Sequence, residues 1–109
     1  MNAAEDGSGL PGPGLKAAAR LLGRPWTLLI LATLAGQPRR FTQIVGQLPG
    51  ISTNLLSERL RVLDRAGLIE RQDDEIAHYR LTSRGRAVVP VLVSLDSWGA
   101  TLDPDQSAT

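Results

Sequence analysis

The polar side chains of residues 52–66 are the clearest candidates for chemistry in this 109-residue chain. Leu56, Leu60 and Leu63 recur at helical spacing, so a helix that buries them turns its opposite side outward. Asn can bond adenine through two atoms, Arg can bond guanine in the same way, and Ser or Thr can contact a base or a phosphate. The outward side therefore predicts a DNA-reading helix, with these contact residues: Thr53, Asn54, Ser57, Glu58 and Arg61.

The same side chains have a second interpretation as a solvated helix face. A helix of a soluble protein exposes polar residues opposite its leucine stripe whether or not it binds anything. Glu58 with Arg61, and Arg61 with Asp64, are also ordinary pairs at i,i+3 spacing. These residues alone leave both interpretations open.

The neighbouring residues place this helix in a helix-turn-helix motif. Apolar residues at helical spacing predict a short helix over residues 41–48, which Pro49 and Gly50 close. Ser52 is a candidate N-cap for the helix that follows. Two helices joined by a short turn containing Gly fit this motif, in which the second helix enters the major groove.

Further candidate DNA contacts lie outside the second helix. Two arginines precede the motif and two lie in the strand-like segments after it, where each could bind a backbone phosphate. A threonine of the helix over residues 41–48 is a further candidate. These contacts are Arg39, Arg40, Thr42, Arg71 and Arg80. Residues 39–86 hold nine arginines and six acids, a local positive excess in a chain whose net charge is +1.

Two helices are predicted before the motif. Residues 15–22 follow helical spacing, and Gly23 ends that helix. Pro25 suits the first turn of a second helix over residues 26–35, because its missing N–H costs nothing there. This second helix is apolar almost all round, so we expect it to be the buried centre of the fold, ended by Gly36.

A hairpin and one helix are predicted after the motif. Gly67 ends the helix over residues 52–66, and strand-like runs at 68–71 and 77–81 flank the polar turn 72–75. Thr82 then caps a last helix, in which Pro90 predicts a kink. One face of that helix is apolar: Val88, Val91, Leu92, Leu95, Trp98 and Leu102.

This order of elements predicts a mainly α fold with a small β-hairpin, the winged helix-turn-helix. We expect one domain over residues 15–102. Residues 1–14 and 103–109 are predicted to be disordered tails, because the Gly, Pro, Ser and acidic residues typical of them bury too little surface to offset the entropy of ordering.

Composition excludes several classes of function. The chain has no cysteine, which rules out disulfides and thiolate metal sites, and its one histidine argues against a transition-metal site. No nucleophile–base pair or Gly-rich phosphate loop suggests catalysis, so we expect neither an enzyme nor a cofactor. The chain has no apolar stretch of the roughly 18 residues that a membrane helix needs, and Glu5 and Asp6 do not fit a secretory signal; we expect a cytoplasmic protein with no membrane contact.

Residues 24–102 resemble the HxlR family of bacterial winged-helix transcription regulators. The resemblance lies in the strings RPWTLLILATL, PRRFTQIVGQLPGIS, LLSERLRVLDRAGLIER, YRLTSRGR and VVPVLVSLDSWG, in the order of the family and nearly at its spacing. It implies a core position for Phe41 and a homodimer built from the first and last helices. It also implies DNA-facing positions for Ser52, Thr53, Asn54, Ser57, Glu58 and Arg61.

The apolar pattern of the terminal helices agrees with a homodimer. Both helices carry more apolar surface than a lone small domain can cover, and a symmetric dimer would bury it. The residues expected at this interface are Leu15, Ala19, Leu22, Trp26, Val89, Leu92, Val93, Leu95 and Trp98.

Two features depart from the family pattern. Relatives often carry a cysteine near the start of the domain, through which some sense oxidants or electrophiles; this chain has none. Many relatives also have a longer wing loop with Pro and Arg, whereas residues 72–76 are short and contain Asp73, Asp74 and Glu75. Because phosphates repel these acids, we expect the wing tip to contribute little to DNA affinity.

The sequence thus predicts a dimeric, sequence-specific DNA-binding regulator, and family precedent favours a repressor. Its partners would be a pseudo-palindromic operator in double-stranded DNA and a second copy of itself, with a small-molecule effector not identified. The alternative is a winged helix used for protein–protein interaction, which the weak net charge and the acidic wing favour. A dimerisation domain of a larger enzyme fits less well, because the chain begins at Met1 and both ends are predicted to be tails.

Overall fold

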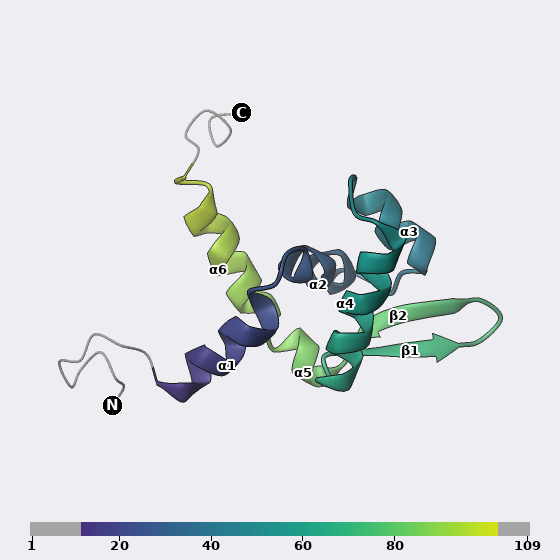
Figure 1. Cartoon of the computed structure of the whole chain (residues 1–109), viewed down its shortest axis with the longest axis horizontal. Coiled ribbons are helices and arrows are strands. Elements are labelled where there is room, and N and C mark those ends of the chain that lie inside the picture. The colour runs from purple at the N-terminus through teal and green to yellow at the C-terminus, as the bar shows by residue number, and fades with distance from the viewer. Residues whose placement is uncertain (1–11, 103–109) are drawn as a thin grey trace.

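Six helices and one antiparallel hairpin make up the computed structural model, which describes residues 12–102 (Figure 1). The order is α1 (Pro13–Leu22), α2 (Thr27–Ala35), α3 (Phe41–Gln47), α4 (Thr53–Arg65), β1 (Ile69–Asp73), β2 (Ala77–Leu81), α5 (Ser83–Arg86) and α6 (Val89–Gly99). Helix α1 begins two residues before the predicted start at Leu15, because Pro13 suits a first helical position. The rest of the predicted tails, residues 1–11 and 103–109, lies outside the described residues.

One apolar cluster forms the core between α2, α3, α4 and the hairpin. The three leucines expected to be buried on α4, Leu56, Leu60 and Leu63, are at most 3% exposed. They meet Ile30 and Leu31 of α2, which are fully buried. Leu29 of the same helix is 53% exposed, so α2 is buried on one side and not all round as its composition predicted. Burying a side chain of this size contributes roughly 1.5–3 kcal/mol, so this cluster holds α4 firmly in place.

Both ends of α4 follow the local signals of the sequence. The hydroxyl of Ser52 accepts a hydrogen bond from the backbone N–H of Leu55 at 3.0 Å, so the predicted N-cap is confirmed. At the other end Gly67 has a φ of +80°, and Leu68 donates to the carbonyl of Leu63 at 3.0 Å. This is the Schellman arrangement, which favours glycine at its left-handed position.

The start of α2 differs from the prediction. The helix begins at Thr27, and the preceding Trp26 has a φ of +76°. The backbone N–H of Thr27 donates to the carbonyl of Arg24 at 3.3 Å, so Pro25 and Trp26 occupy the middle of a turn of type II geometry. Pro25 therefore belongs to this turn and not to the first turn of the helix.

The hairpin is longer on its first strand than the sequence indicated. β1 pairs with β2 from Ile69 opposite Leu81 to Asp73 opposite Ala77, so the turn shrinks to residues 74–76. Leu68, expected in the strand, instead completes the end of α4. Arg39 forms an isolated antiparallel β-bridge with Tyr79 of β2, in which the two backbones exchange hydrogen bonds of 2.9 and 2.8 Å.

The predicted last helix is two helices rather than one kinked helix. The short α5 is capped by Thr82, whose hydroxyl accepts from the N–H of Gly85 at 3.1 Å, and the chain turns at residues 87–88 before α6 begins. Pro90 lies in the first turn of α6, where its missing N–H and fixed φ are tolerated. The proline therefore starts a helix here instead of bending one.

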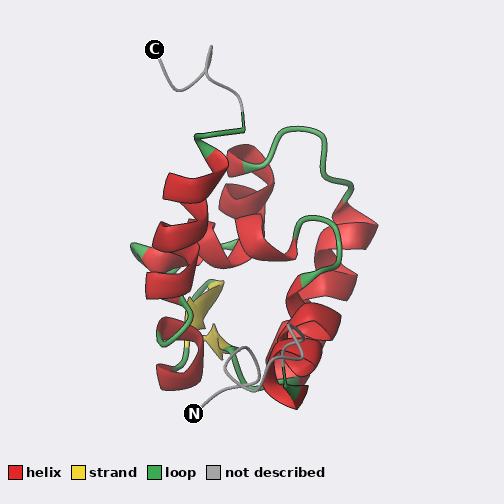
Figure 2. Ribbon diagram, turned by 90° about the vertical axis from the view of Figure 1, so that its left-hand side faces the viewer, coloured by secondary structure: helices red, strands yellow, loops and turns green. Residues whose placement is uncertain are grey.

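Helices α1 and α6 project from the rest of the fold (Figure 1). Figure 2, coloured by secondary structure, shows that the fold is mainly helical with one short pair of strands. Neither helix has a buried residue. The radius of gyration is 15.9 Å, above the roughly 13 Å typical of a compact domain of 100 residues.

None of the helices within residues 12–102 has the length and apolar character needed to cross a membrane.

Candidate nucleic-acid interface

The turn between α3 and α4 fixes the direction in which α4 leaves the core. Gly50 has a φ of +97°, a left-handed conformation that suits glycine. On either side of it Leu48 and Ile51 are buried, and the N–H of Ile51 donates to the carbonyl of Leu48 at 3.1 Å. The turn is thus anchored by two core side chains, and the start of α4 is held at the surface.

The first three turns of α4 present their polar residues to solvent. All six predicted contact residues are exposed: Ser52, Thr53, Asn54, Ser57, Glu58 and Arg61. The hydroxyl of Ser52 is already used to cap the helix, although it can still donate its own hydrogen. Glu58 forms an ion pair with Arg59 at 3.2 Å. The exposed side of α4 therefore leaves Thr53, Asn54, Ser57 and Arg61 as its main hydrogen-bonding groups.

Arg59 is a structural residue that the sequence analysis missed. Its side chain is nine-tenths buried, and its Nε donates to the carbonyl of Pro25 at 3.0 Å. Position 59 lies three residues after Leu56 and four before Leu63, which places it within the buried stripe. That spacing could have identified it as the residue that fastens α4 to the turn before α2.

A hollow of about 260 Å³ joins α4 to the hairpin. Ser57, Arg61 and Asp64 line it from α4, and Arg71 and Tyr79 line it from the two strands. The structure therefore brings together Ser57, Arg61 and Arg71, three of the predicted contact residues, on one surface.

The arginines of the hairpin are paired with acids of the same hairpin. The Nε of Arg71 lies 2.7 Å from Oδ1 of Asp73, and the Nε of Arg80 lies 2.6 Å from Oε1 of Glu70. Residues 69–81 hold four acids against two arginines, so the formal charge of the hairpin is −2 with histidine neutral. Side chains alternate between faces along a strand, so Arg80 lies on the face opposite Arg71 and Tyr79.

The residues before α4 divide between structural and exposed positions. The Nε of Arg39 donates to the carbonyl of Thr33 at 2.6 Å, which ties this half-buried residue to the end of α2. This placement argues against the phosphate contact expected of Arg39. Arg40 and Thr42 are exposed at the start of α3, where the side chain of Gln43 accepts from the N–H of Arg40 at 2.9 Å. Phe41 packs against the core as implied.

The residues expected at a dimer interface fall into two groups. Four of them pack half-buried against the chain's own core: Leu22, Trp26, Val89 and Leu92. The other five are exposed in the single chain: Leu15, Ala19, Val93, Leu95 and Trp98. The apolar face predicted for the last helix is largely uncovered too, since Val91 is 50% and Leu102 is 67% exposed.

Residues 21–107 match the family model described as HxlR-like helix-turn-helix. The chain belongs to this family. The HTH-type transcriptional regulator YodB of Bacillus subtilis is 34% identical over 90 residues, which cover 79% of this chain and 80% of YodB. The uncharacterized HTH-type regulator YvaP of the same organism is 32% identical over 97 residues, covering 84% and 90%.

Solved structures share the fold of this HxlR-like chain. The reduced form of YodB matches it with a TM-score of 0.76 at 32% identity, covering 86% of this chain and 96% of that one. A possible HxlR family transcriptional factor from Thermoplasma volcanium matches with a TM-score of 0.74 at 36% identity, covering 78% and 80%. The predicted winged helix-turn-helix fold is confirmed, and the chain is a DNA-binding transcriptional regulator rather than an enzyme.

Proposed function

We propose that this HxlR-like regulator binds a pseudo-palindromic operator as a homodimer and represses the adjacent gene. The observation that carries the proposal is the shared surface of α4 and the hairpin, where Ser57, Arg61 and Arg71 line one hollow. A helix entering the major groove would bring the hairpin side of that hollow, with Arg71, against the sugar–phosphate backbone. A regulator of this kind acts in the cytoplasm, where the bacterial chromosome lies.

Within this surface, the contacts have different roles. Asn54, Ser57 and Arg61 project from the first turns of α4, where side chains of a recognition helix reach base edges. Arg40 and Thr42 at the start of α3, and Arg71 on the hairpin, would bind phosphates, which position the protein without reading sequence. Arg80 is paired with Glu70 on the other hairpin face and has a smaller part in this proposal.

The exposed apolar residues of α1 and α6 support a homodimer. Val93 and Trp98 are both 61% exposed, and Leu15 is 58% exposed. A soluble chain that leaves such side chains uncovered on two projecting helices has a surface suited to a symmetric partner. Two α4 helices related by that symmetry would reach major grooves about one helical turn apart, on the order of 10 bp.

Fluorescence anisotropy tests the proposal directly. The full chain is titrated onto duplexes that tile the DNA upstream of its own gene, beside a scrambled duplex, at two salt concentrations. We expect tight binding to one tile, with log affinity falling linearly with log salt concentration. Equal binding to every duplex would overturn sequence-specific recognition, and no binding would overturn the DNA-reading role of α4.

A second candidate function is binding to another protein through the hairpin. It is favoured by the charge of −2 on residues 69–81 and by Ile76, which is 56% exposed beside the acidic turn. Absence of binding to any duplex in the anisotropy series, with an intact fold, would make this candidate the better one.

Repression is tested in cells. The operator tile is placed upstream of a reporter gene, and the reporter is measured with and without the regulator. We expect expression to rise when the regulator is removed. A fall in expression would show activation and overturn the proposed sign.

An effector that acts through a cysteine thiol does not fit this chain. One YodB structure, which matches this chain with a TM-score of 0.74 at 34% identity over 83% of this chain and 99% of that one, is quinone-bound. This chain contains no cysteine, so a covalent thiol adduct cannot control it. Any effector of this regulator must bind through other groups.

A further inference from the structure

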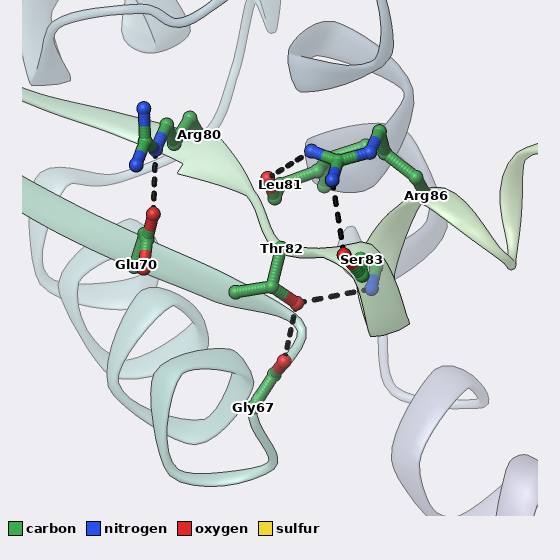
Figure 3. A network of polar contacts seen from close by, with 8 residues as sticks. Gly67, Glu70, Arg80, Leu81, Thr82, Ser83 and Arg86 are labelled. Atoms are coloured by element: carbon green, nitrogen blue, oxygen red, sulfur yellow. Dashed lines mark hydrogen bonds and ion pairs between the residues drawn. The ribbon is translucent and has the colours of Figure 1, made fainter.

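A second hollow lies at the base of the hairpin, where it meets α5 (Figure 3). Its volume is about 540 Å³, which is within the range of roughly 300–1,000 Å³ that small-molecule pockets occupy. Three arginines line it: Arg80 from β2, and Arg84 and Arg86 from α5. Arg80 lies on the hairpin face opposite Arg71 and Tyr79, so this hollow is separate from the DNA-reading surface.

The arginines of α5 are held by neutral acceptors. Arg86 donates from Nη1 to the carbonyl of Leu81 at 3.0 Å and from Nη2 to the hydroxyl of Ser83 at 3.1 Å, as Figure 3 shows. Arg84 donates from Nη1 to the carbonyl of Ala66 at 3.2 Å. These bonds orient the guanidinium groups without neutralising their charge. Each guanidinium has five N–H donors, so both arginines keep donors for a ligand.

The charge of the hollow is positive. Glu70 is the one carboxylate among its lining residues, and it is paired with Arg80 at 2.6 Å. Three arginines and one glutamate leave a formal charge of +2. Planar guanidinium groups match the two oxygens of a carboxylate or phosphate, so this charge favours an oxyanion over a neutral molecule.

The floor of the hollow is rigid. The hydroxyl of Thr82 donates to the carbonyl of Gly67 and accepts from the N–H of Gly85, which ties the end of α4 to the start of α5. Gly85 is buried in α5, and the carbonyl of Leu68 lies so close to it that a Cβ would not fit. Arg86, held by two hydrogen bonds, and Arg84, held by one, lose less conformational entropy on binding a ligand than unrestrained arginines would.

We propose that this hollow binds a small molecule that carries two or more oxyanion groups, and that it is an effector site of the regulator. The ligand bridges Arg80 of the hairpin and Arg84 and Arg86 of α5. Carboxylates and phosphates share the chemistry that these residues recognise, so the test includes one probe of each kind. The site is spatially separate from the proposed DNA-reading surface, because none of its arginines lines the hollow on the α4 surface.

Isothermal titration calorimetry of the full chain without DNA tests the site. The probes are pyrophosphate and citrate, titrated at constant ionic strength against wild type, Arg84→Gln and Arg86→Gln. Arg20→Gln is the matched control, since Arg20 is exposed on α1, outside the hollow. We expect saturable binding of at least one probe, weakened about tenfold or more in both α5 variants and unchanged in the control. The probe that binds tighter identifies the oxyanion.

Three results would overturn the site. The first is the absence of saturable binding by wild type, and the second is equal weakening in Arg20→Gln. The third is loss of DNA affinity in the α5 variants when wild type binds neither probe, which would make the hollow a DNA-backbone contact. Should Arg86→Gln fail to fold, backbone amide shifts of wild type replace it: a probe must shift residues 83–86 more than residues 53–61. A failed DNA titration leaves the calorimetry unaffected, because the calorimetric titrations contain no DNA.

Discussion

Arg61 and Arg71 line the same hollow but differ in their surroundings. Arg71 is paired with Asp73, whereas Arg61 makes no hydrogen bond to another side chain in the described part of the chain. In the proposed complex, Arg61 would reach base edges from the recognition helix, and Arg71 would reach the DNA backbone from a strand. The two residues can therefore separate base reading from phosphate binding.

Arg61→Ala is expected to weaken binding to the operator by about 1–3 kcal/mol while leaving scrambled DNA almost unaffected. Arg71→Ala is expected to weaken binding to both duplexes by the same factor, because a phosphate contact carries no sequence information. It should also lower the slope of log affinity against log salt concentration, because one phosphate contact is lost. Anisotropy with both duplexes measures both effects. If Arg61→Ala costs the same on both duplexes, Arg61 is a phosphate contact.

The substitution Gly85→Ala tests how tightly the junction of the hairpin and α5 is packed. A Cβ added there would lie 2.0 Å from the carbonyl oxygen of Leu68, which is backbone and cannot move aside. Gly85→Ala is expected to lower the free energy of unfolding by about 1–3 kcal/mol. Gly46→Ala is the control: nothing lies within 4 Å of its added Cβ in α3, and it should stabilise by about 0.5–1 kcal/mol. Urea denaturation measures both, and an unchanged midpoint for Gly85→Ala would contradict the clash.

At the scale of elements, the hairpin limits its own affinity for DNA. Arg71 and Asp73 are 56% and 66% exposed, so their ion pair contributes little to folding. The pair does reduce the charge that Arg71 offers to a phosphate. The hairpin therefore behaves as a wing in shape, with little of a wing's usual positive charge.

Neutralising the acids of the wing tip is expected to release Arg71. The variant Asp73→Asn, Asp74→Asn, Glu75→Gln should bind operator and scrambled DNA more tightly at low salt, because Arg71 then contacts its phosphate without competition from Asp73. The salt slope should steepen by less than the roughly 0.9 of one whole phosphate contact. The same three substitutions combined with Arg71→Ala should lose most of that gain. Affinity that does not change at low salt would mean that the wing tip lies too far from DNA to matter.

The elements that the sequence predicted well are those set by local chemistry. Helix α4, its Ser52 cap and its Gly67 end follow from side chains within a few residues, and the structure confirms them. The turn before α2 was not predicted, because type II turns favour glycine where this chain has Trp26. The separation of α5 from α6 was missed as well, since Pro90 fits a kink or a helix start equally well from sequence alone.

The candidate site was predictable in part for the same reason. Exposure of Asn54 and Arg61 follows from helical periodicity within α4. The partners of Arg39 and Arg80 do not, because Arg39 turns back to α2 and Arg80 meets Glu70 only through the register of the two strands. Side-chain partners across elements depend on tertiary packing, which a single sequence does not display.

At the scale of the whole molecule, α1 and α6 contact the core through partly buried residues such as Leu22 and Leu92, and they carry exposed apolar side chains beyond it. A symmetric partner would cover them, and it would also set the distance between two recognition helices. DNA affinity and oligomeric state are then linked: a monomer can hold only one half-site, and the second contact is lost with the dimer.

Trp98→Glu is expected to leave the chain a folded monomer where wild type forms the proposed dimer, because Trp98 is 61% exposed in the single chain and lies outside the core. A buried unpaired carboxylate at a dimer interface is strongly unfavourable, so association should weaken while the core stays intact. Ile76→Glu is the matched control: it changes a side chain that is 56% exposed on the wing tip, and the dimer should persist. Sedimentation velocity gives the oligomeric state, circular dichroism checks the fold, and anisotropy compares duplexes with one and two half-sites. A Trp98→Glu variant that remains dimeric would place the interface elsewhere, and a wild type that is already monomeric would remove the proposed interface. If the monomeric variant binds both duplexes equally while wild type prefers the duplex with two half-sites, the symmetry of the dimer sets operator recognition.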